Sequence, residues 1–485
     1  MFMRTPLVIS GLFLAQAFAT PAFSLTPEEV WTEWNTALDG SGIHVTADVE
    51  RLDQQMNITH LTLRLPPDDE GGSAELSLGG ITLAPVGDGT VRITLEPDTP
   101  FALTTPGPTL RGHYAQAGFV MTASGAPGDT DYAYRAQTLN LRIDEMSGPD
   151  GAVQQMQPPI TLIADAPSGQ ASLGTRDRIS LTQSSAIDSL RVSVQQTDPK
   201  VGDLSLNLMA KTLKSDTESW IDPARVAQDG LRAARHYSSA QSFGAADMQF
   251  SLVDGSDSLY LQSDSQGGQS TTTLDGTGLS YDMTASQTTL GVRGSDIPFA
   301  LQTSIGQVRA AASGPTQPQD SPQPFSLTVA LDQVTLPDIA WAILDATGKL
   351  PRDPISLTLE MTGEGRLLAN DQPPEITSLN VENFDLRGLG AQISADGAFD
   401  ADPAQRSRFG AYPKFTGQLN VRAKGVMSVI QTLTSTGILP PSVGFSSALY
   451  AGMFARQVNG PDDLATTLKV TPDEEIMING QVISP

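Results

Sequence analysis

The chain has 485 residues, so at about 150 residues per domain we expect more than one domain. Its 29 Lys and Arg residues face 54 Asp and Glu residues, and the resulting formal charge of −25 repels nucleic-acid phosphates. We therefore expect no nucleic-acid partner. Because 39% of the residues are hydrophobic and only 17% are charged, the composition predicts a folded chain, not a disordered acidic one.

The N-terminus has the features of a secretory signal peptide. A basic start at Met1–Arg4 precedes the uncharged, mostly apolar stretch Pro6–Ala19, which is shorter than the roughly 20 residues that span a bilayer. Cleavage after Ala19 and cleavage after Ser24 both fit the small-residue pattern, and an uncleaved anchor is the alternative. We expect residues 1–24 to be removed, and we expect no stable transmembrane span afterwards.

The sequence contains no cysteine. This excludes disulfides, thiolate metal sites and a cysteine nucleophile. Long secreted eukaryotic chains usually carry disulfides, so an exported cysteine-free acidic protein fits the bacterial periplasm better.

The mature chain is predicted to begin with a helix near residues 27–38. Thr26 is a candidate N-cap, Pro27 suits the first helical position, and Glu29 completes a capping box. Trp31 and Trp34 follow at helical spacing, where they are expected to anchor the helix on a core.

Period-two alternation dominates the rest of the chain. It is typical of antiparallel strands that bury one face and expose the other. We therefore predict a mainly β fold, with large antiparallel twisted or curved sheets and a few short helices packed on them. The clearest alternating sets are Ile43/Val45/Ala47/Val49, Leu61/Leu63/Leu65, Val91/Ile93/Leu95, Leu139/Leu141/Ile143, Leu204/Leu206/Leu208, Leu327/Val329/Leu331, Leu357/Leu359/Met361 and Phe415/Gly417/Leu419/Val421.

Turn-forming pairs are expected to separate strands at Asp88-Gly89, Asp254-Gly255, Asp275-Gly276, Asp396-Gly397 and Asn479-Gly480. Further helices are predicted near residues 223–236 and 337–347, each beginning next to a proline. Residues 313–324 contain four prolines and should form a Pro-rich linker or a long loop. The segment divides a β-rich region at 25–312 from a second one at 325–485, although one continuous sheet remains an alternative to two domains.

Residues 425–455 contain no charged side chain. Val426, Val429, Ile430 and Leu433 have helical spacing, and the prolines and polar residues of the segment disfavour a membrane span. One interpretation is a buried helical pair that closes the end of a sheet. The other is a helical cap over an apolar groove or a membrane-facing hairpin, for which the candidate groove-lining residues are Phe445, Leu449, Met453 and Phe454.

No pattern in the sequence specifies a reaction. The four histidines lack zinc-site spacing, and the acidic clusters lack the spacing of known calcium loops. The glycine pairs at Gly276/Gly278 and Gly388/Gly390 do not meet the requirements of a nucleotide loop. We therefore expect no catalytic residues, no cofactor and no metal ion.

The N-terminal Trp31/Trp34 helix, the strand Phe101–Pro106 and the closing stretch Thr471–Val482 resemble an uncharacterised family of exported proteobacterial proteins, a domain of unknown function. The strand-rich stretch Leu379–Gly397 is also similar to AsmA-like envelope proteins. That resemblance implies long curved antiparallel sheets with an apolar inner face. A chain with a cleaved signal peptide would lack the anchoring helix of those proteins.

The sequence thus favours a non-enzymatic periplasmic protein that binds an apolar or amphipathic envelope component, such as a lipid, in a sheet-lined groove. A structural scaffold that binds another envelope protein and no small ligand is the first alternative. An unrecognised hydrolase is the second, because carboxylates brought together only by folding leave no sequence motif.

Overall fold

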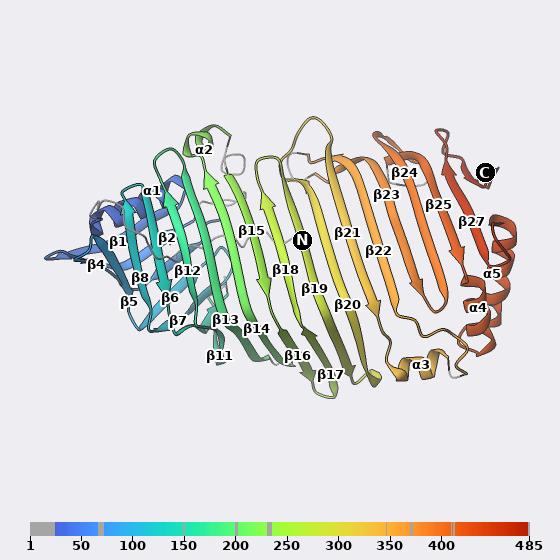
Figure 1. Cartoon of the computed structure of the whole chain (residues 1–485), viewed down its shortest axis with the longest axis horizontal. Helices are drawn as coiled ribbons and strands as arrows, with labels where there is room; N and C mark the ends of the chain where they lie inside the picture. The colour runs from blue at the N-terminus through green and yellow to red at the C-terminus, as the bar shows by residue number, and fades with distance from the viewer. Residues whose placement is uncertain are drawn as a thin grey trace. The chain divides into compact units, whose positions relative to one another are not determined.

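The computed structural model describes residues 25–65, 72–148, 151–198, 202–229, 235–345, 347–368, 372–408, 410 and 413–483. The predicted signal peptide lies outside these residues. The described chain is mainly β, with antiparallel strand pairs and short helices, as the alternation predicts (Figure 1).

The chain forms two compact units. Unit 1 comprises the chain up to Gln262 together with Leu274–Gly276 and Gly294–Asp296. Unit 2 comprises Ser263–Thr273, Thr277–Arg293 and the chain from Ile297 onward. The chain passes between the units within strands β17 (Asp257–Ser265), β18 (Gly267–Leu274) and β19 (Gly278–Gly294), and in the short connections that follow β18 and β19.

Unit 1 begins with the predicted helix, α1 (Pro27–Gly40). The capping box is present, because the Thr26 side chain accepts from the Glu29 backbone and the Glu29 carboxylate accepts from the Thr26 backbone. The following elements are β1 (His44–Leu52), β2 (Gln55–Arg64), β3 (Glu75–Leu78), β4 (Ile81–Val86), β5 (Thr90–Leu95), β6 (Asp98–Thr104), β7 (Thr109–Ala117), β8 (Val120–Ala126), β9 (Asp129–Arg135), β10 (Thr138–Ser147), β11 (Val153–Asp165), β12 (Ser168–Gly174), β13 (Ile179–Asp198), β14 (Gly202–Ile221), α2 (Pro223–Asp229), β15 (Arg235–Phe243) and β16 (Ala246–Asp254).

Strand pairing in unit 1 follows two routes from β2. One route runs through β4, β5, β8, β9 and β12 to β13. The other runs through β3, β6, β7, β10 and β11 to β13, which then pairs with β14. The core lies between α1 and the first route, and its enclosed side chains include Val30, Met56, Ile58, Leu83, Val91, Ile93 and Met121.

The second predicted helix is shorter than expected. A helix is predicted over residues 223–236, but α2 is described only over Pro223–Asp229, residues 230–234 lie outside the described residues, and Arg235 and His236 belong to β15. His236 lies directly opposite Trp220 of β14, and the two rings stack with centroids 5.7 Å apart. This cross-strand pair favours an extended backbone over a longer helix.

Unit 2 continues with β20 (Ile297–Pro315), β21 (Gln323–Val334), α3 (Asp338–Leu344), β22 (Ile355–Arg366), β23 (Glu375–Gly388), β24 (Ala391–Arg406), β25 (Pro413–Lys424), α4 (Val426–Ser435), α5 (Pro441–Phe454), β26 (Arg456–Gln457), β27 (Asp463–Val470), β28 (Ile476–Ile478) and β29 (Gln481–Val482). Strands β20 to β25 pair in sequence order, β25 then pairs with β27, and β27 with β28. Figure 1 shows these strands side by side.

The Pro-rich residues 313–324 are a loop at a hairpin. Their two ends belong to β20 and β21, which pair with each other near Ser313 and Ser326. The chain therefore turns back within unit 2 at this segment, and the division between the two units lies earlier in the sequence.

Four of the five predicted turn pairs join consecutive strands, but Asp396-Gly397 does not. It lies inside β24, where Gly397 is opposite Leu419 of β25. A Cβ atom at Gly397 would clash with the Gln418 carbonyl oxygen. The glycine is therefore explained by the close approach of a neighbouring strand and not by a turn.

Candidate apolar binding face

The register of unit 2 places its alternating apolar residues on one side of the sheet. Leu359 of β22 is directly opposite Val329 of β21 and Phe384 of β23, and directly opposed residues share a face. We call this side the apolar face. It consists of Val308, Ala310 and Ala312 of β20, Leu327, Val329 and Leu331 of β21, Leu357, Leu359 and Met361 of β22, Leu379, Val381, Phe384 and Leu386 of β23, Ile393, Ala395 and Phe399 of β24, Phe415, Leu419, Val421 and Ala423 of β25, Leu464, Leu468 and Val470 of β27, and Ile476 and Ile478 of β28.

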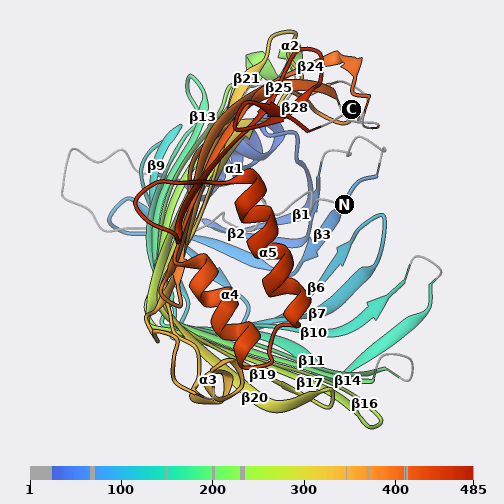
Figure 2. The same cartoon turned by 90° about the vertical axis from the view of Figure 1, so that its right-hand side faces the viewer.

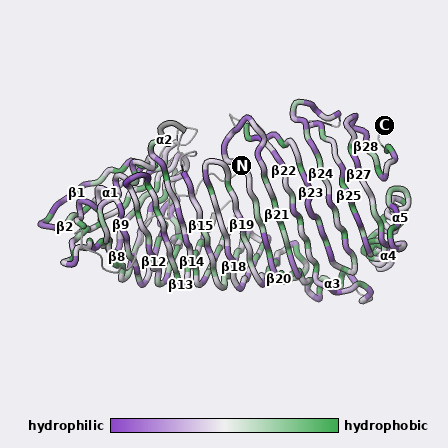
Figure 3. Tube along the Cα trace, turned by 45° about the horizontal axis from the view of Figure 1, so that its top comes forward, coloured by the Kyte–Doolittle hydropathy of each residue, from purple (hydrophilic) through white to green (hydrophobic). Residues whose placement is uncertain are grey.

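The opposite side of the same strands is polar. Arg422 donates two hydrogen bonds to Asp463, from Nε to Oδ1 at 2.8 Å and from Nη2 to Oδ2 at 2.7 Å. Asn420 donates to Asp396 at 3.0 Å on the same side. The sheet of unit 2 therefore separates a solvated polar face from the apolar face, and Figure 3 shows the resulting alternation along the strands.

The apolar face is largely uncovered within unit 2. Among its members only Val470 is buried, with 7% of its surface exposed, and the others are half-buried or exposed. A sheet face packed against a second layer would bury its central side chains, as the core beneath α1 does in unit 1. Contiguous exposed apolar surface of this kind marks an interaction site in a soluble protein.

Unit 1 also contains a set of alternating apolar residues that is largely uncovered, along its second route of strands and the neighbouring β14 and β16. Only Ala164 and Ala210 are buried in that set, and the other members are half-buried or exposed. The set consists of Leu139, Leu141 and Ile143 of β10, Ile160, Leu162 and Ala164 of β11, Leu190, Val192 and Val194 of β13, Leu204, Leu206, Leu208 and Ala210 of β14, and Met248, Phe250 and Leu252 of β16.

The uncharged segment 425–455 forms the helices α4 and α5, which contact each other at the end of the unit-2 sheet (Figure 2). Asp462 caps α4, because its carboxylate accepts from the Met427 and Ser428 backbone nitrogens, each at 2.9 Å. Thr466 donates from Oγ1 to the Phe454 carbonyl at 2.8 Å. Since Thr466 is opposite Val421, the end of α5 lies on the side of the apolar face.

The four predicted groove residues do not form an enclosed wall. Phe445, Leu449 and Met453 lie on the outer side of α5 and have 73%, 48% and 57% of their surface exposed. Phe454 is half-buried and stacks on Tyr450 with ring centroids 6.2 Å apart. The sequence identified the apolar helix, but not which of its sides faces outward.

The buried carboxylates of the described residues have structural partners and are not clustered. They are Glu33 on α1, Asp345 after α3 and Glu474 between β27 and β28. Asp345 accepts from the Leu350 backbone at 2.6 Å, and Glu474 accepts from the Arg408 backbone at 3.0 Å. These two carboxylates stabilise loops.

Glu33 is the most unusual of the three. Its Oε2 accepts from the Thr130 hydroxyl, whereas its Oε1 has no hydrogen-bond partner. Burial raises the pKa of Glu33, and the Thr130 hydrogen bond offsets this only in part. Next to it, Trp34 donates to the Tyr132 hydroxyl at 2.6 Å, within the core. The surroundings are those of a buried helix–sheet contact, not of a cleft.

The histidines do not gather into a site. His60 and His113 each contact a separate aspartate, Asp48 and Asp98, at 3.1 Å on exposed strands. Over the described ranges, no three His, Asp or Glu side chains converge in a way that could hold a metal ion.

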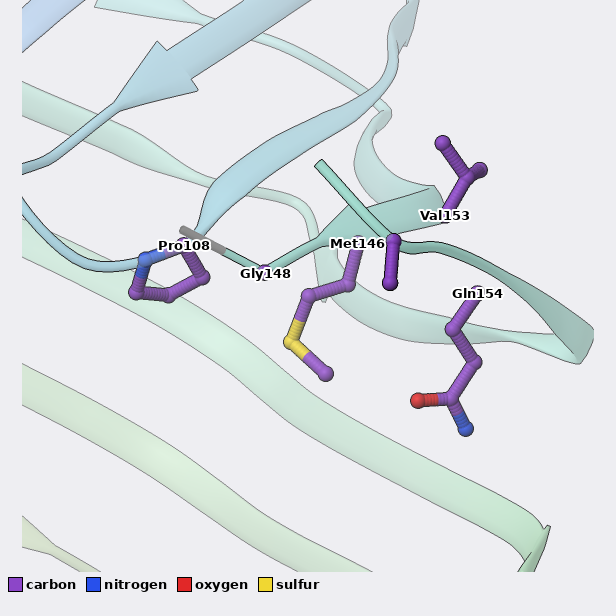
Figure 4. A pocket seen from close by; sticks show the side chains of 6 residues that line it. Pro108, Met146, Gly148, Val153 and Gln154 are labelled. Atoms are coloured by element: carbon purple, nitrogen blue, oxygen red, sulfur yellow. The ribbon is translucent and has the colours of Figure 1, made fainter. Parts of the chain in front are cut away.

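A pocket of about 260 Å³ opens in unit 1 at the ends of β7, β10 and β11 (Figure 4). Its lining consists of Pro108, Met146, Gly148, Ala152, Val153 and Gln154. None of these is an acid, a base or a nucleophile, so the pocket offers no chemistry for a reaction.

Comparison with known proteins finds no matching family model, no similar curated protein and no similar solved structure. Within the described part of the chain, no helix has the length and hydropathy needed to cross a bilayer.

Proposed function

We propose that the protein is a non-enzymatic periplasmic binding protein whose apolar face in unit 2 takes up the acyl chain of an envelope lipid. The observation that carries this is the continuous row of half-exposed aliphatic and aromatic side chains from β20 to β28. Burying one acyl methylene against such a surface contributes about 0.8 kcal/mol. Several methylenes along the strands therefore suffice for useful affinity.

The chemistry of the face supports a lipid over a polar ligand. Its members carry aliphatic, aromatic and thioether side chains, which offer contact area but no strong hydrogen-bond donors. Acyl chains need only such contact. The polar groups that could orient a headgroup lie on the other side of the strands or at their ends.

A titration with a fluorescent fatty acid tests the proposal. Leu359→Asn places an amide in the middle of the apolar face and should weaken binding about tenfold or more, because a polar group then faces the acyl chain. The matched control is Thr358→Asn. Thr358 is the preceding residue of β22, points to the polar face opposite Asp385, and should leave the affinity unchanged.

Absence of fatty-acid binding by the unaltered protein would overturn the proposal. Equal loss of binding in Leu359→Asn and Thr358→Asn would also count against the proposal, because the loss would then reflect damage to the fold. In either case the scaffold interpretation becomes the better account of the exposed apolar surface.

A further inference from the structure

Helix α5 is apolar on all sides and exposes several large side chains. The exposed Phe445, Leu449 and Met453 recur every four residues, which places them in one stripe along the helix. Ser446 and Ser447 lie on the half-buried side, and Ser446 donates to the Val443 carbonyl at 3.2 Å. A helix on a solvated surface normally exposes a polar side. On α5 only Ser442 and Tyr450 carry exposed polar groups, and they share the surface with the apolar stripe.

The stripe belongs to a helical hairpin without charge. Gly444 at the start of α5 lies against Thr434 near the end of α4, so the two helices run antiparallel. No charged residue occurs between Lys424 and Arg456. A protein partner of this stripe would find no ion pair to fix its orientation, whereas a fluid apolar phase needs none.

The charges at the base of the hairpin suit a phosphate-bearing surface. Lys424 precedes α4 and Arg456 follows α5, and both are exposed. The nearby carboxylates have other hydrogen-bond donors, because Asp462 accepts from the first turn of α4 and Asp463 accepts from Arg422, although Asp463 also lies opposite Lys424 and interacts with its charge. The basic groups therefore lie where lipid phosphates would lie if the apolar stripe entered a bilayer surface.

We infer that α5 docks the protein on a zwitterionic lipid surface, with Phe445, Leu449 and Met453 inserted among the acyl chains. The helix lies in the plane of the interface and does not cross the bilayer, since its 14 residues span only about 21 Å. The Thr466–Phe454 hydrogen bond joins the end of α5 to the side of the apolar face. Docking would thus bring that face to the lipid surface.

Vesicle flotation with the full mature chain tests this inference. We expect the protein to float with phosphatidylcholine vesicles, and to bind less well when half of the lipid is phosphatidylglycerol, because the chain carries a formal charge of −25. The triple variant F445S/L449S/M453S should lose binding about tenfold or more, since it removes the inserted apolar area. Its thermal midpoint should stay the same, because these side chains are exposed.

The control variant is L52S/V120S/V153S, which removes three exposed apolar side chains from β1, β8 and β11. It should float like the unaltered protein. No flotation of the unaltered protein, or equal flotation of the F445S/L449S/M453S variant, would overturn the inference. So would a change from dimer to monomer in that variant without a change in flotation, because the stripe would then bind a second copy.

Fatty-acid binding separates this inference from the proposed function. The F445S/L449S/M453S variant should still bind the free fluorescent fatty acid in the absence of vesicles. Conversely, Leu359→Asn should still float. Loss of both properties in both variants would contradict the separate roles assigned to α5 and the apolar face.

Discussion

At the scale of single residues, two neighbouring aspartates hold the end of the unit-2 sheet. Asp462 accepts three hydrogen bonds from the start of α4, two from backbone nitrogens and one from the Ser428 hydroxyl at 2.5 Å. The residue at the N-cap position, Gly425, has no side chain to do this. A distant residue therefore performs the capping that a local Ser, Thr or Asp usually performs.

Replacing Asp462 by Ala should lower the free energy of unfolding by about 1 to 2 kcal/mol, the usual cost of a lost cap. Burial raises the pKa of the Asp462 carboxyl, but the hydrogen bonds from Ser428 and Met427 lower it more. Chemical denaturation measures the loss. The matched control is Asp473→Ala, an exposed aspartate in a turn, which should change the free energy by less than about 0.5 kcal/mol. Equal effects would show that Asp462 does not act as a cap.

Asp463 should make the stability of unit 2 sensitive to acid. Its hydrogen bonds with Arg422 lower the pKa of Asp463 to about 2, even though burial acts in the opposite direction. An unfolded aspartate has a pKa of about 3.9, so the stabilisation is complete above about pH 4 and is lost as the pH falls towards 2. Unfolding free energies measured over this range should fall less steeply for Asp463→Asn. Parallel curves for the two proteins would exclude this role.

At the scale of elements, α1 and α5 place apolar side chains in opposite environments. α1 packs Val30 and Trp34 into the core of unit 1, whereas α5 contains no buried residue although it is uncharged throughout. Hydrophobic composition alone would predict burial for both helices. The difference is that α1 has a polar side for solvent, while α5 has few polar residues and no polar side.

Two methionines provide a direct comparison of these environments. Met56→Ala removes a fully enclosed side chain of β2 and should cost about 2 to 5 kcal/mol through lost transfer energy and a residual cavity. Met453→Ala removes a side chain on α5 that is 57% exposed, and should change stability by less than about 0.5 kcal/mol. Denaturant unfolding of both variants gives the two values. A large loss for Met453→Ala would mean that α5 is packed in solution.

The elements also show how far the sequence predicts this fold. Alternation identified the strands, and the Thr26–Glu29 capping box identified α1, because both signals are local. The shortening of α2 and the placement of Asp396-Gly397 inside β24 depend on neighbouring strands, through the Trp220–His236 stack and the Gln418 carbonyl. The alternating sets contained the members of the apolar face on β21, β22 and β25, but not those on the other strands. Whether the apolar residues of different strands lie on one face depends on the register between those strands, which no local sequence pattern contains.

At the scale of the molecule, stability is distributed unevenly between the two units. Unit 1 has an enclosed core beneath α1, whereas the strands from β20 to β28 have few fully buried side chains. The long, mutually paired strands of unit 2 therefore depend mainly on backbone hydrogen bonds and half-buried contacts. A ligand on the apolar face would bury the side chains that the fold leaves half-exposed.

Hydrogen exchange should detect the stabilisation that a bound ligand provides. Saturation with a fatty acid should slow amide exchange in β21 to β25, because ligand at about 100 times its Kd adds about 2.7 kcal/mol to the stability of the bound state. Peptides from β2, β5 and β8 should exchange at the same rate with and without ligand, because they enclose the core of unit 1. Mass spectrometry of peptides reports both regions in one experiment. Slowing confined to β2, β5 and β8, or absent from β21 to β25, would place the ligand elsewhere than on the apolar face of unit 2.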